Sequence, residues 1–587
     1  MKSQYSFKLL LTLTPRLRLT NTISRFVYAC LLGLLFSSLA FADDGATNTL
    51  FCQPSLLGDQ GRRFSAWSHS IAFANGKFVN AVAVKEFIDQ PTDMGLAIFD
   101  SDDGVHWRET APFACPLPRA VPGYCWRWDG DAFVYYITER NTGPDRKDYP
   151  TVVRQHRSVD LENWEFMGDE FTTRPDNRWY RCRWDELVIL DDGEKFYGYI
   201  TSEPRPELAR DSMGMLQSAD GLRWEVLPPP VFEWDGLPPQ QMEVCLCEKI
   251  GDRYYLGMGS RSYMGHLGFS VVMFVSDSPT GPFRPDKGAF RLCGNTTRDT
   301  NWLAKTFRRD GEVLLSNWIT TDRDESFRGI YANGRSLWIG PLKKLIADED
   351  GHARIAWWPG NEAAKNDALP ANAGDAILAH PAEKHRGTLY SFKAEGEDSV
   401  TMKAGHDGAI AMLPEKFDFT RGVILEGVLR ATEPRGPVVG THWHPAAAGF
   451  FFEHAPGKGM LVQMETLGLT RTGVFEFRSE PAFDADEFSL AAFGNVQRGG
   501  PYLGLSRFVE EDVIGPLGYA VPCGIRSATP HRFRLLIKNG IWELYLDDRY
   551  VQTYITGPTS GRLGLFAKSG PVEFSELKAW NMTRPER

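Results

Sequence analysis

One short motif recurs four times in the first half of the chain at nearly constant spacing. Its leading serines, Ser101, Ser158, Ser218 and Ser276, are 57, 60 and 58 residues apart. Each copy combines a β-rich run, a polar turn, an aromatic residue and a second short apolar run. A fixed period of a few tens of residues indicates a repeat architecture, and four-stranded sheets repeated around an axis form a β-propeller. The four copies read SDDGVHW, SVDLENW, SADGLRW and SDSPTGPF.

The length of the repetitive region predicts the number of blades. It extends from about Ala66 to Trp358, which corresponds to about five periods of the motif. Asn75 and Gly76 separate two apolar runs, and an Asn-Gly pair in that position is a strong signal for a β-hairpin. The sequence therefore predicts a propeller of five blades.

The second half of the chain has a different composition. Residues 359–385 are rich in Ala, Asn, Gly and Pro and are expected to form a linker. Short alternating strands follow, as in the segments RFRLLIK and IWELYLD on either side of Asn539 and Gly540. About 200 residues of this kind indicate a two-sheet sandwich. We therefore predict an all-β protein, with a five-bladed β-propeller over residues 43–358 followed by a C-terminal β-sandwich over residues 386–587.

Residues 1–42 have the features of a signal peptide. Five Lys or Arg residues and no acidic residue lie in this segment, and an apolar stretch begins at Phe26. Ala40, Phe41 and Ala42 have the small-x-small form of a signal-peptidase site. We expect this segment to be removed and the protein to be secreted, either to the periplasm or outside the cell.

Charge and motif content exclude several classes of function. The formal net charge is −10, and the basic leader makes the remaining chain more acidic still. Nucleic acid is not expected as a partner, because phosphate binding needs clustered cations. No later stretch has the ~20 apolar residues of a membrane span. No P-loop, zinc-protease motif or hydrolase nucleophile elbow is present, so the sequence indicates neither a cofactor nor a metal site.

Equivalent ends of the innermost strands should meet at the mouth of the central channel. The repeat frame places His69, Asp129, Asp185, Glu243 and Asp299 at these ends, with spacings of 60, 56, 58 and 56 residues. Acidic groups that converge on one funnel repel one another, which shifts their pKa values and marks a candidate functional site. The alternative for each acid is a structural hydrogen bond at a strand end.

Aromatic and basic side chains flank these positions. Sugars stack their C–H faces on aromatic rings and donate hydroxyl hydrogen bonds to carboxylates, so an oligo- or polysaccharide is the expected ligand. The alternative for the tryptophans is packing between blades. The expected substrate-binding residues are Trp67, Arg127, Trp128, Arg183, Trp184, Asp299 and Trp302.

The repeats and three later segments resemble glycoside hydrolase family 32, the invertase, inulinase and levanase group, which is related to family 43. Residues 339–359 are similar to the family's exit from blade five. Residues 533–555 and 561–582 are similar to the end of its C-terminal sandwich. The resemblance covers about residues 60–585 and implies a propeller that carries acids on blades one, three and four.

The family's motifs are matched only in part. Arg183 and Asp185 stand where the family has its R-D-P motif, with Trp184 between them. Glu243 stands where the family has its acid/base Glu, and the cysteine that follows comes one residue late. The blade-one position of the nucleophilic Asp reads WSHS over residues 67–70 and contains no carboxylate. The resemblance therefore implies a glycosidase with a modified mechanism.

Two functions remain open at this point. The first is a hydrolase of a fructan or another furanoside or oligosaccharide, with Glu243 as the acid and Asp185 as the group that orients a hydroxyl. Asp129 or His69 would be the base, and a base that acts through water would invert the anomeric centre. The second is a carbohydrate-binding protein that has lost its nucleophile. A sialidase is less favoured, because five repeats fit better than six.

Overall fold

The computed structural model describes the part of the chain that carries the repeats and most of the C-terminal strands. These residues belong to one compact unit, Thr47–Arg587, and the predicted signal peptide lies outside them. Across the described residues, no helix is both long and apolar enough to cross a membrane. The described ranges are 49–52, 64–86, 94–117, 120–140, 151–205, 213–233, 240–263, 266–286, 291–295, 302–322, 335–380, 389–396, 398–405, 408–432, 446–455, 458–465, 472–478, 526–555 and 560–583.

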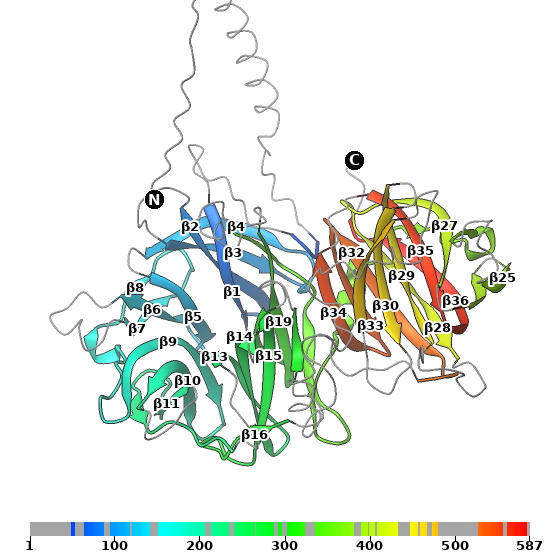
Figure 1. Ribbon diagram of the computed structural model, residues 1–587. Helices are drawn as coiled ribbons and strands as arrows, with labels where there is room; N and C mark the ends of the chain where they lie inside the picture. The colour runs from blue at the N-terminus through cyan, green and yellow to red at the C-terminus, as the bar shows by residue number, and fades with distance from the viewer. Residues whose placement is uncertain are drawn as a thin grey trace, which may run out of the picture. The chain divides into compact units, whose positions relative to one another are not determined.

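Five antiparallel sheets follow one another along the chain and are here called the first to the fifth sheet (Figure 1). In the first three, the strands pair in chain order. The strands of the first sheet are β1 (Phe64–Ala74), β2 (Lys77–Glu86), β3 (Met94–Ser101) and β4 (Arg108–Leu117). Those of the second are β5 (Ala120–Trp128), β6 (Phe133–Arg140), β7 (Thr151–Ser158) and β8 (Glu165–Phe166), and those of the third are β9 (Tyr180–Asp191), β10 (Phe196–Pro204), β11 (Met213–Ser218) and β12 (Glu225–Leu227).

The fourth and fifth sheets repeat this order and add one further strand each. β17 joins the fourth sheet through β15, and β20 joins the fifth through β19. The strands of the fourth sheet are β13 (Gln240–Ile250), β14 (Arg253–Tyr263), β15 (His266–Ser276), β16 (Arg284–Pro285) and β17 (Arg291–Asn295). Those of the fifth are β18 (Trp302–Arg309), β19 (Glu312–Asp322), β20 (Arg335–Trp338), β21 (Lys343–Ala347) and β22 (Ala353–Trp357).

The first strands of the five sheets contact one another in cyclic order. β1 contacts β5, β5 contacts β9, β9 contacts β13, β13 contacts β18, and β18 contacts β1. The second halves of these five strands also line one cavity of about 280 Å³. The five strands therefore run in the same direction around a common channel, which is the arrangement that the repeat spacing predicts for a propeller.

The recurring Ser-x-Asp motif forms the same turn in the first three sheets. Ser101, Ser158 and Ser218 each accept, at Oγ, a 2.8 Å hydrogen bond from the backbone N–H three residues later. The Asp two residues after each serine accepts hydrogen bonds from two backbone N–H groups, those of the residues two and three positions after the Asp. The fourth copy differs, because Ser276 accepts instead from the N–H of Ser278. Side-chain caps of this kind fix a turn locally, which explains the periodic signal in the sequence.

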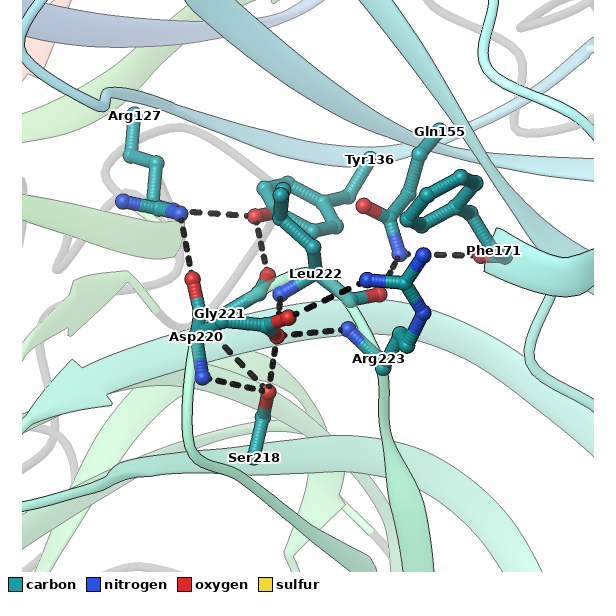
Figure 2. Close-up of polar contacts among 9 residues, drawn as sticks. All are labelled: Arg127, Tyr136, Gln155, Phe171, Ser218, Asp220, Gly221, Leu222 and Arg223. Carbon is teal, nitrogen blue, oxygen red and sulfur yellow. Dashed lines mark hydrogen bonds and ion pairs between the residues drawn. The ribbon is translucent and has the colours of Figure 1, made fainter.

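A tyrosine connects the outer turn of each of the last three sheets to the preceding sheet. Tyr136 on β6 donates a 2.6 Å hydrogen bond to the carbonyl of Gly221 in the turn of the third sheet (Figure 2). Tyr199 on β10 donates to the carbonyl of Pro279 at 2.6 Å, and Tyr255 on β14 donates to that of Gly351 at 2.7 Å. Each bond joins the second strand of one sheet to the outer turn of the next, so neighbouring sheets are fixed in a common register.

The C-terminal strands form two further sheets that pack on each other. One continues from β22 through a bridge between Ala356 and Arg549, and the other contains β27, β29 and β35. Phe450 on β29 packs against Phe533 on β32 and Phe574 on β36 of the facing sheet, with ring centroids 4.8 and 6.1 Å apart, respectively. The elements after β22 are η4 (Pro359–Ala364), β23 (Ala368–Leu369), η5 (Ala373–Asp375), β24 (Ile377–His380), β25 (Leu389–Glu395), β26 (Ser399–Ala404), β27 (Ala409–Asp418), β28 (Val423–Ala431), β29 (Ala447–Ala455), β30 (Lys458–Glu465), β31 (Thr472–Arg478), β32 (His531–Lys538), β33 (Ile541–Leu546), β34 (Arg549–Ile555), β35 (Ser560–Lys568) and β36 (Gly570–Asn581), and η3 (Asp169–Phe171) precedes them.

A fully buried ion pair joins the fifth sheet to the sandwich. Lys343 Nζ on β21 lies 3.1 Å from Glu543 Oε2 on β33, and both side chains are inaccessible to solvent. Glu543 also accepts hydrogen bonds from the hydroxyls of Tyr545 and Thr553. Burial lowers the pKa of Lys343, and the nearby Glu543 carboxylate opposes that effect. Each charge is therefore tolerated only because its partner is present.

Replacing one member of this pair should destabilise the protein strongly. In Glu543→Gln the Lys343 ammonium stays buried without a carboxylate, and we expect a loss of about 3–5 kcal/mol in the free energy of unfolding. Chemical denaturation, monitored by tryptophan fluorescence, measures this loss.

The matched control is an exposed ion pair of the same sandwich. Arg430 and Glu573 lie 2.5 Å apart with side chains 51% and 35% exposed, so Glu573→Gln should cost less than about 1 kcal/mol. The double variant Lys343→Met/Glu543→Leu should recover most of the loss, because neither charge is then left unpaired. Equal effects of Glu543→Gln and Glu573→Gln would contradict this account.

Candidate active site

Arg183 connects the two acids that the sequence placed on the third and fourth sheets. Its Nε lies 3.1 Å from both carboxylate oxygens of Asp185, and its Nη2 donates a 2.6 Å hydrogen bond to Glu243 Oε1. The three side chains are 32%, 22% and 11% exposed, respectively. Burial alone would lower the pKa of Arg183, but the two carboxylates raise it above its ordinary value. The guanidinium therefore holds two carboxylates from different sheets at one site.

Local backbone irregularities place these residues. The pairing of β9 with β10 shifts register between Tyr199 and Thr201, and the pairing of β13 with β14 shifts between Val244 and Leu246. Similar shifts occur in β1 near residue 67 and in β18 near residue 303. A β-bulge of this kind bends a strand and redirects side chains, and bulges are frequent next to active sites. Asp185 lies beside the bulge of its own strand, and Glu243 lies two residues before the unpaired Cys245.

Glu186 is a third acid of this cluster and was missed by the sequence analysis. Its side chain is buried, and Oε2 has no hydrogen-bond partner among the residues that the structure describes. Its φ of 56° lies in the left-handed region, which a glutamate rarely adopts. Burial and then the neighbouring Glu243 carboxylate raise the pKa of Glu186 to about 8, although the charge of Lys305 opposes them. Glu186 is therefore mostly protonated at neutral pH, and a strained, perturbed acid of this kind is typical of functional sites.

His69 is buried in the middle of β1, the first strand of the first sheet. Its ring Nδ1 lies 3.4 Å from Asn80 Nδ2 on β2, and the side chain is 1% exposed. Burial lowers the pKa of His69 to about 4, and the charges of Lys343 and Lys305 act in the same direction. The imidazole is therefore neutral at pH 7 and a weak base, which disfavours the catalytic role expected from the sequence.

Asp129 does not join the carboxyl cluster. It follows the last residue of β5, and its Oδ1 accepts hydrogen bonds from the backbone N–H groups of Asp131 and Ala132 in the next turn. Since the five first strands run in the same direction, this turn lies at the end of the channel opposite to Asp185 and Glu243. The repeat frame was wrong here because β5 ends just before the aligned position, whereas Asp185 lies in the middle of β9.

The predicted substrate-binding residues have different surroundings. Trp184 is fully buried, packs against Tyr180 and donates its indole N–H to Thr173 Oγ1, so it is a core residue and not a surface for sugar stacking. Arg127 and Trp128 line the channel cavity and not the carboxyl cluster. Asp299 and the side chains of Trp67 and Trp302 lie outside the described residues.

Solved structures with similar folds are glycoside hydrolases. The Bombyx mori family 32 β-fructofuranosidase has a TM-score of 0.56 and 12% sequence identity, over 96% of this chain and 99% of that one. The sucrose-6-phosphate hydrolase from Lactobacillus gasseri has a TM-score of 0.59 and 10% identity, over 95% and 96%. The fructan 1-exohydrolase IIa from Cichorium intybus has a TM-score of 0.54 and 13% identity, over 92% and 98%.

The fold of this chain is similar to that of the family 32 β-fructofuranosidase over almost the whole of both chains. The resemblance inferred from the repeats and the C-terminal segments is thereby confirmed for the fold, including the propeller and the sandwich. No protein-family model matches the sequence, and no curated protein matches it. At 10–13% identity the likeness establishes the fold alone.

The raised pKa of Glu186 predicts how stability depends on pH. The pKa of Glu186 is about 4.5 in the unfolded chain and about 8 in the folded protein. The protonated group therefore stabilises the folded state fully below pH 4.5, and this contribution is lost as the pH rises through about 8. Glu186→Gln removes this dependence. Between pH 5 and 9, the unfolding midpoint of the wild type should therefore fall relative to that of the variant.

Thermal unfolding at a series of pH values measures the difference. Glu165→Gln is the control, because Glu165 is exposed on β8 and its replacement should leave the curve parallel to that of the wild type. A constant offset between the wild type and Glu186→Gln over this range would show that Glu186 is ionised throughout.

Proposed function

We propose that the protein is a secreted glycoside hydrolase that cleaves a glycosidic bond in a fructan or another furanoside-containing oligosaccharide. The single observation that carries this proposal is the cluster in which Arg183 holds Asp185 and Glu243 beside the buried Glu186. Glycosidic cleavage needs a protonated acid for the leaving oxygen and an ionised carboxylate for the sugar, and this cluster contains both. Solved structures of the same fold support a sugar substrate, since one is described in complex with sucrose and another with fructosylnystose.

Within this proposal Glu186 supplies the proton. Its environment keeps it protonated at neutral pH, whereas Glu243 accepts a charge-assisted hydrogen bond from Arg183. This assignment revises the expectation from the sequence that Glu243 is the acid. Glu243 would instead activate water or stabilise the positive charge that develops on the sugar.

Asp185 and Arg183 have supporting roles in the same scheme. Both carboxylate oxygens of Asp185 accept hydrogen bonds from Nε of Arg183. This contact fixes the plane of the Arg183 guanidinium and with it the position of Glu243. A sugar hydroxyl is the group that Asp185 would bind when substrate enters. An inverting reaction is the natural outcome if Glu243 acts through water, because blade one offers no carboxylate at residues 67–70 to form a covalent intermediate.

Substrates with different leaving groups test the roles of the two glutamates. On a fructan, Glu186→Gln should lower kcat about 10²–10⁴-fold, since general acid catalysis contributes roughly that much. On an aryl fructofuranoside with an activated leaving group, the loss should be much smaller, because little protonation is needed. Glu243→Gln should lower kcat on both substrates to a similar extent.

The outcomes of this experiment are separable. If Glu243→Gln spares the activated substrate and Glu186→Gln does not, Glu243 is the acid and our assignment is wrong, although the glycosidase proposal stands. If both variants keep wild-type turnover, the cluster is not the catalytic site. Asp185→Glu is the control for position, because it keeps the charge and displaces the carboxylate.

A carbohydrate-binding protein without catalysis is the second candidate. The observation that favours it is the neutral, buried His69 in the segment where the family has its nucleophilic Asp. This function predicts that the wild type binds fructans, measured by calorimetry, and releases no reducing sugar from them. Measurable turnover that is lost in the Glu186→Gln variant would exclude it.

A further inference from the structure

The channel cavity is a second site, separate from the carboxyl cluster. It has a volume of about 280 Å³ and is lined by the second halves of the first strands of all five sheets. Arg183, Asp185 and Glu243 do not contribute to its walls, because they lie in the first halves of β9 and β13. The volume is close to the lower limit of cavities that bind small ligands.

Lys305 is the central polar group of this cavity. Its side chain on β18 is 5% exposed, and Nζ has no hydrogen-bond partner among the described residues. The described ion pairs do not include it either. An unpaired ammonium is costly to bury, so a negative partner is needed at this point. The positive charge of Lys305 acts on His69, Glu186 and Cys245 from three other sheets, which places it close to the channel axis.

Besides Lys305, the charged groups that line the cavity are Arg127, Arg308, Glu248 and Asp191, so three cations face two carboxylates. Asp191 is exposed at the end of β9, and its Oδ1 accepts a hydrogen bond from the backbone N–H of Gly193. Arg308 pairs with Glu248 at 2.9 Å, so these two charges compensate each other. Arg127 donates from Nε to the hydroxyl of Tyr136 at 2.9 Å and from Nη2 to the carbonyl of Asp220 at 3.0 Å (Figure 2). Both acceptors are neutral, so Arg127 adds a cation that its described contacts do not compensate.

The apolar walls narrow the class of ligand. Phe196 lies under the guanidinium of Arg127 at 4.9 Å, and Trp128 lines the cavity beside them. A hydrated inorganic ion gains little from such walls, whereas a flat or apolar body gains from burial. The ligand that fits this combination has one carboxylate and a small apolar or ring-shaped body.

We propose that the channel cavity binds a small organic carboxylate, with its carboxylate group on the ammonium of Lys305 and its body between Trp128 and Phe196. This site is separate from the carboxyl cluster, but the charge of Lys305 acts on Glu186, so a carboxylate bound to Lys305 would also raise the pKa of Glu186. The ligand enters at the channel end to which the first strands run, opposite to the carboxyl cluster.

Benzoate is the probe, because it combines the carboxylate and the ring-shaped apolar part that the proposed ligand needs. Isothermal titration of the full chain with sodium benzoate should show saturable binding and a rise in the thermal midpoint, since a ligand that binds only the folded state stabilises it. Benzyl alcohol, which has the same ring without the charge, should bind at least 10-fold more weakly. Sodium chloride at the same ionic strength should give no saturable binding.

Three variants keep the test decisive. Lys305→Met should weaken benzoate binding at least 10-fold and should raise the thermal midpoint of the free protein, because it removes an unpaired buried charge. Lys305→Arg should retain binding, and Glu186→Gln should leave it unchanged. The proposal is overturned if benzoate does not bind, if benzyl alcohol binds equally well, or if Lys305→Met binds as the wild type does. A lower thermal midpoint of free Lys305→Met would also overturn it, because Lys305 would then have a partner within the protein.

Discussion

The hydrogen bond from a tyrosine to the outer turn of the next sheet is the interaction on which the arrangement of the sheets depends. Tyr136, Tyr199 and Tyr255 make it in three successive pairs of sheets. Each acceptor lies in a turn that side chains cap locally: Ser218 and Asp220 cap the first, Ser276 and Ser278 the second, and Asp348 the third. Local capping and the packing of neighbouring sheets therefore support each other. Only when the sheets are held in this register do their first strands line one channel, with the carboxyl cluster in their first halves and the cavity in their second halves.

The cluster shows how a fold can keep neighbouring carboxyl groups in different protonation states. Arg183 compensates Asp185 and Glu243, and their remaining negative charge, together with burial, keeps Glu186 neutral. Removing the guanidinium would leave three carboxyl groups to share the proton differently, so Arg183 is a positioning residue and also sets the protonation of the site. The positive charge of Lys305 limits how far the pKa of Glu186 rises.

The sequence predicted the repeats well because each is encoded locally. Serine and aspartate at fixed offsets form the turn without help from distant residues, and the family 32 fold followed from the same motifs and the C-terminal segments. The site was harder to predict, because bulges shift the register by one residue without leaving a pattern in the sequence. Counting residues placed Asp129 beside Asp185, although Asp129 follows the end of β5 and Asp185 lies within β9. Glu186 could have been noticed as the neighbour of Asp185, but its burial and its positive φ depend on the packing of three sheets.

The central claim is that the cluster holds a proton on Glu186 at neutral pH. Difference infrared spectroscopy of the carboxyl C=O band measures this directly, with a titration from pH 5 to 10 on the wild type and the two Glu→Gln variants. The account predicts a protonated-carboxyl band that titrates near pH 8, is absent in Glu186→Gln, and remains in Glu243→Gln with a lower midpoint, because a neighbouring negative charge is gone. A band that is missing at pH 7, or that disappears in Glu243→Gln and persists in Glu186→Gln, would contradict it.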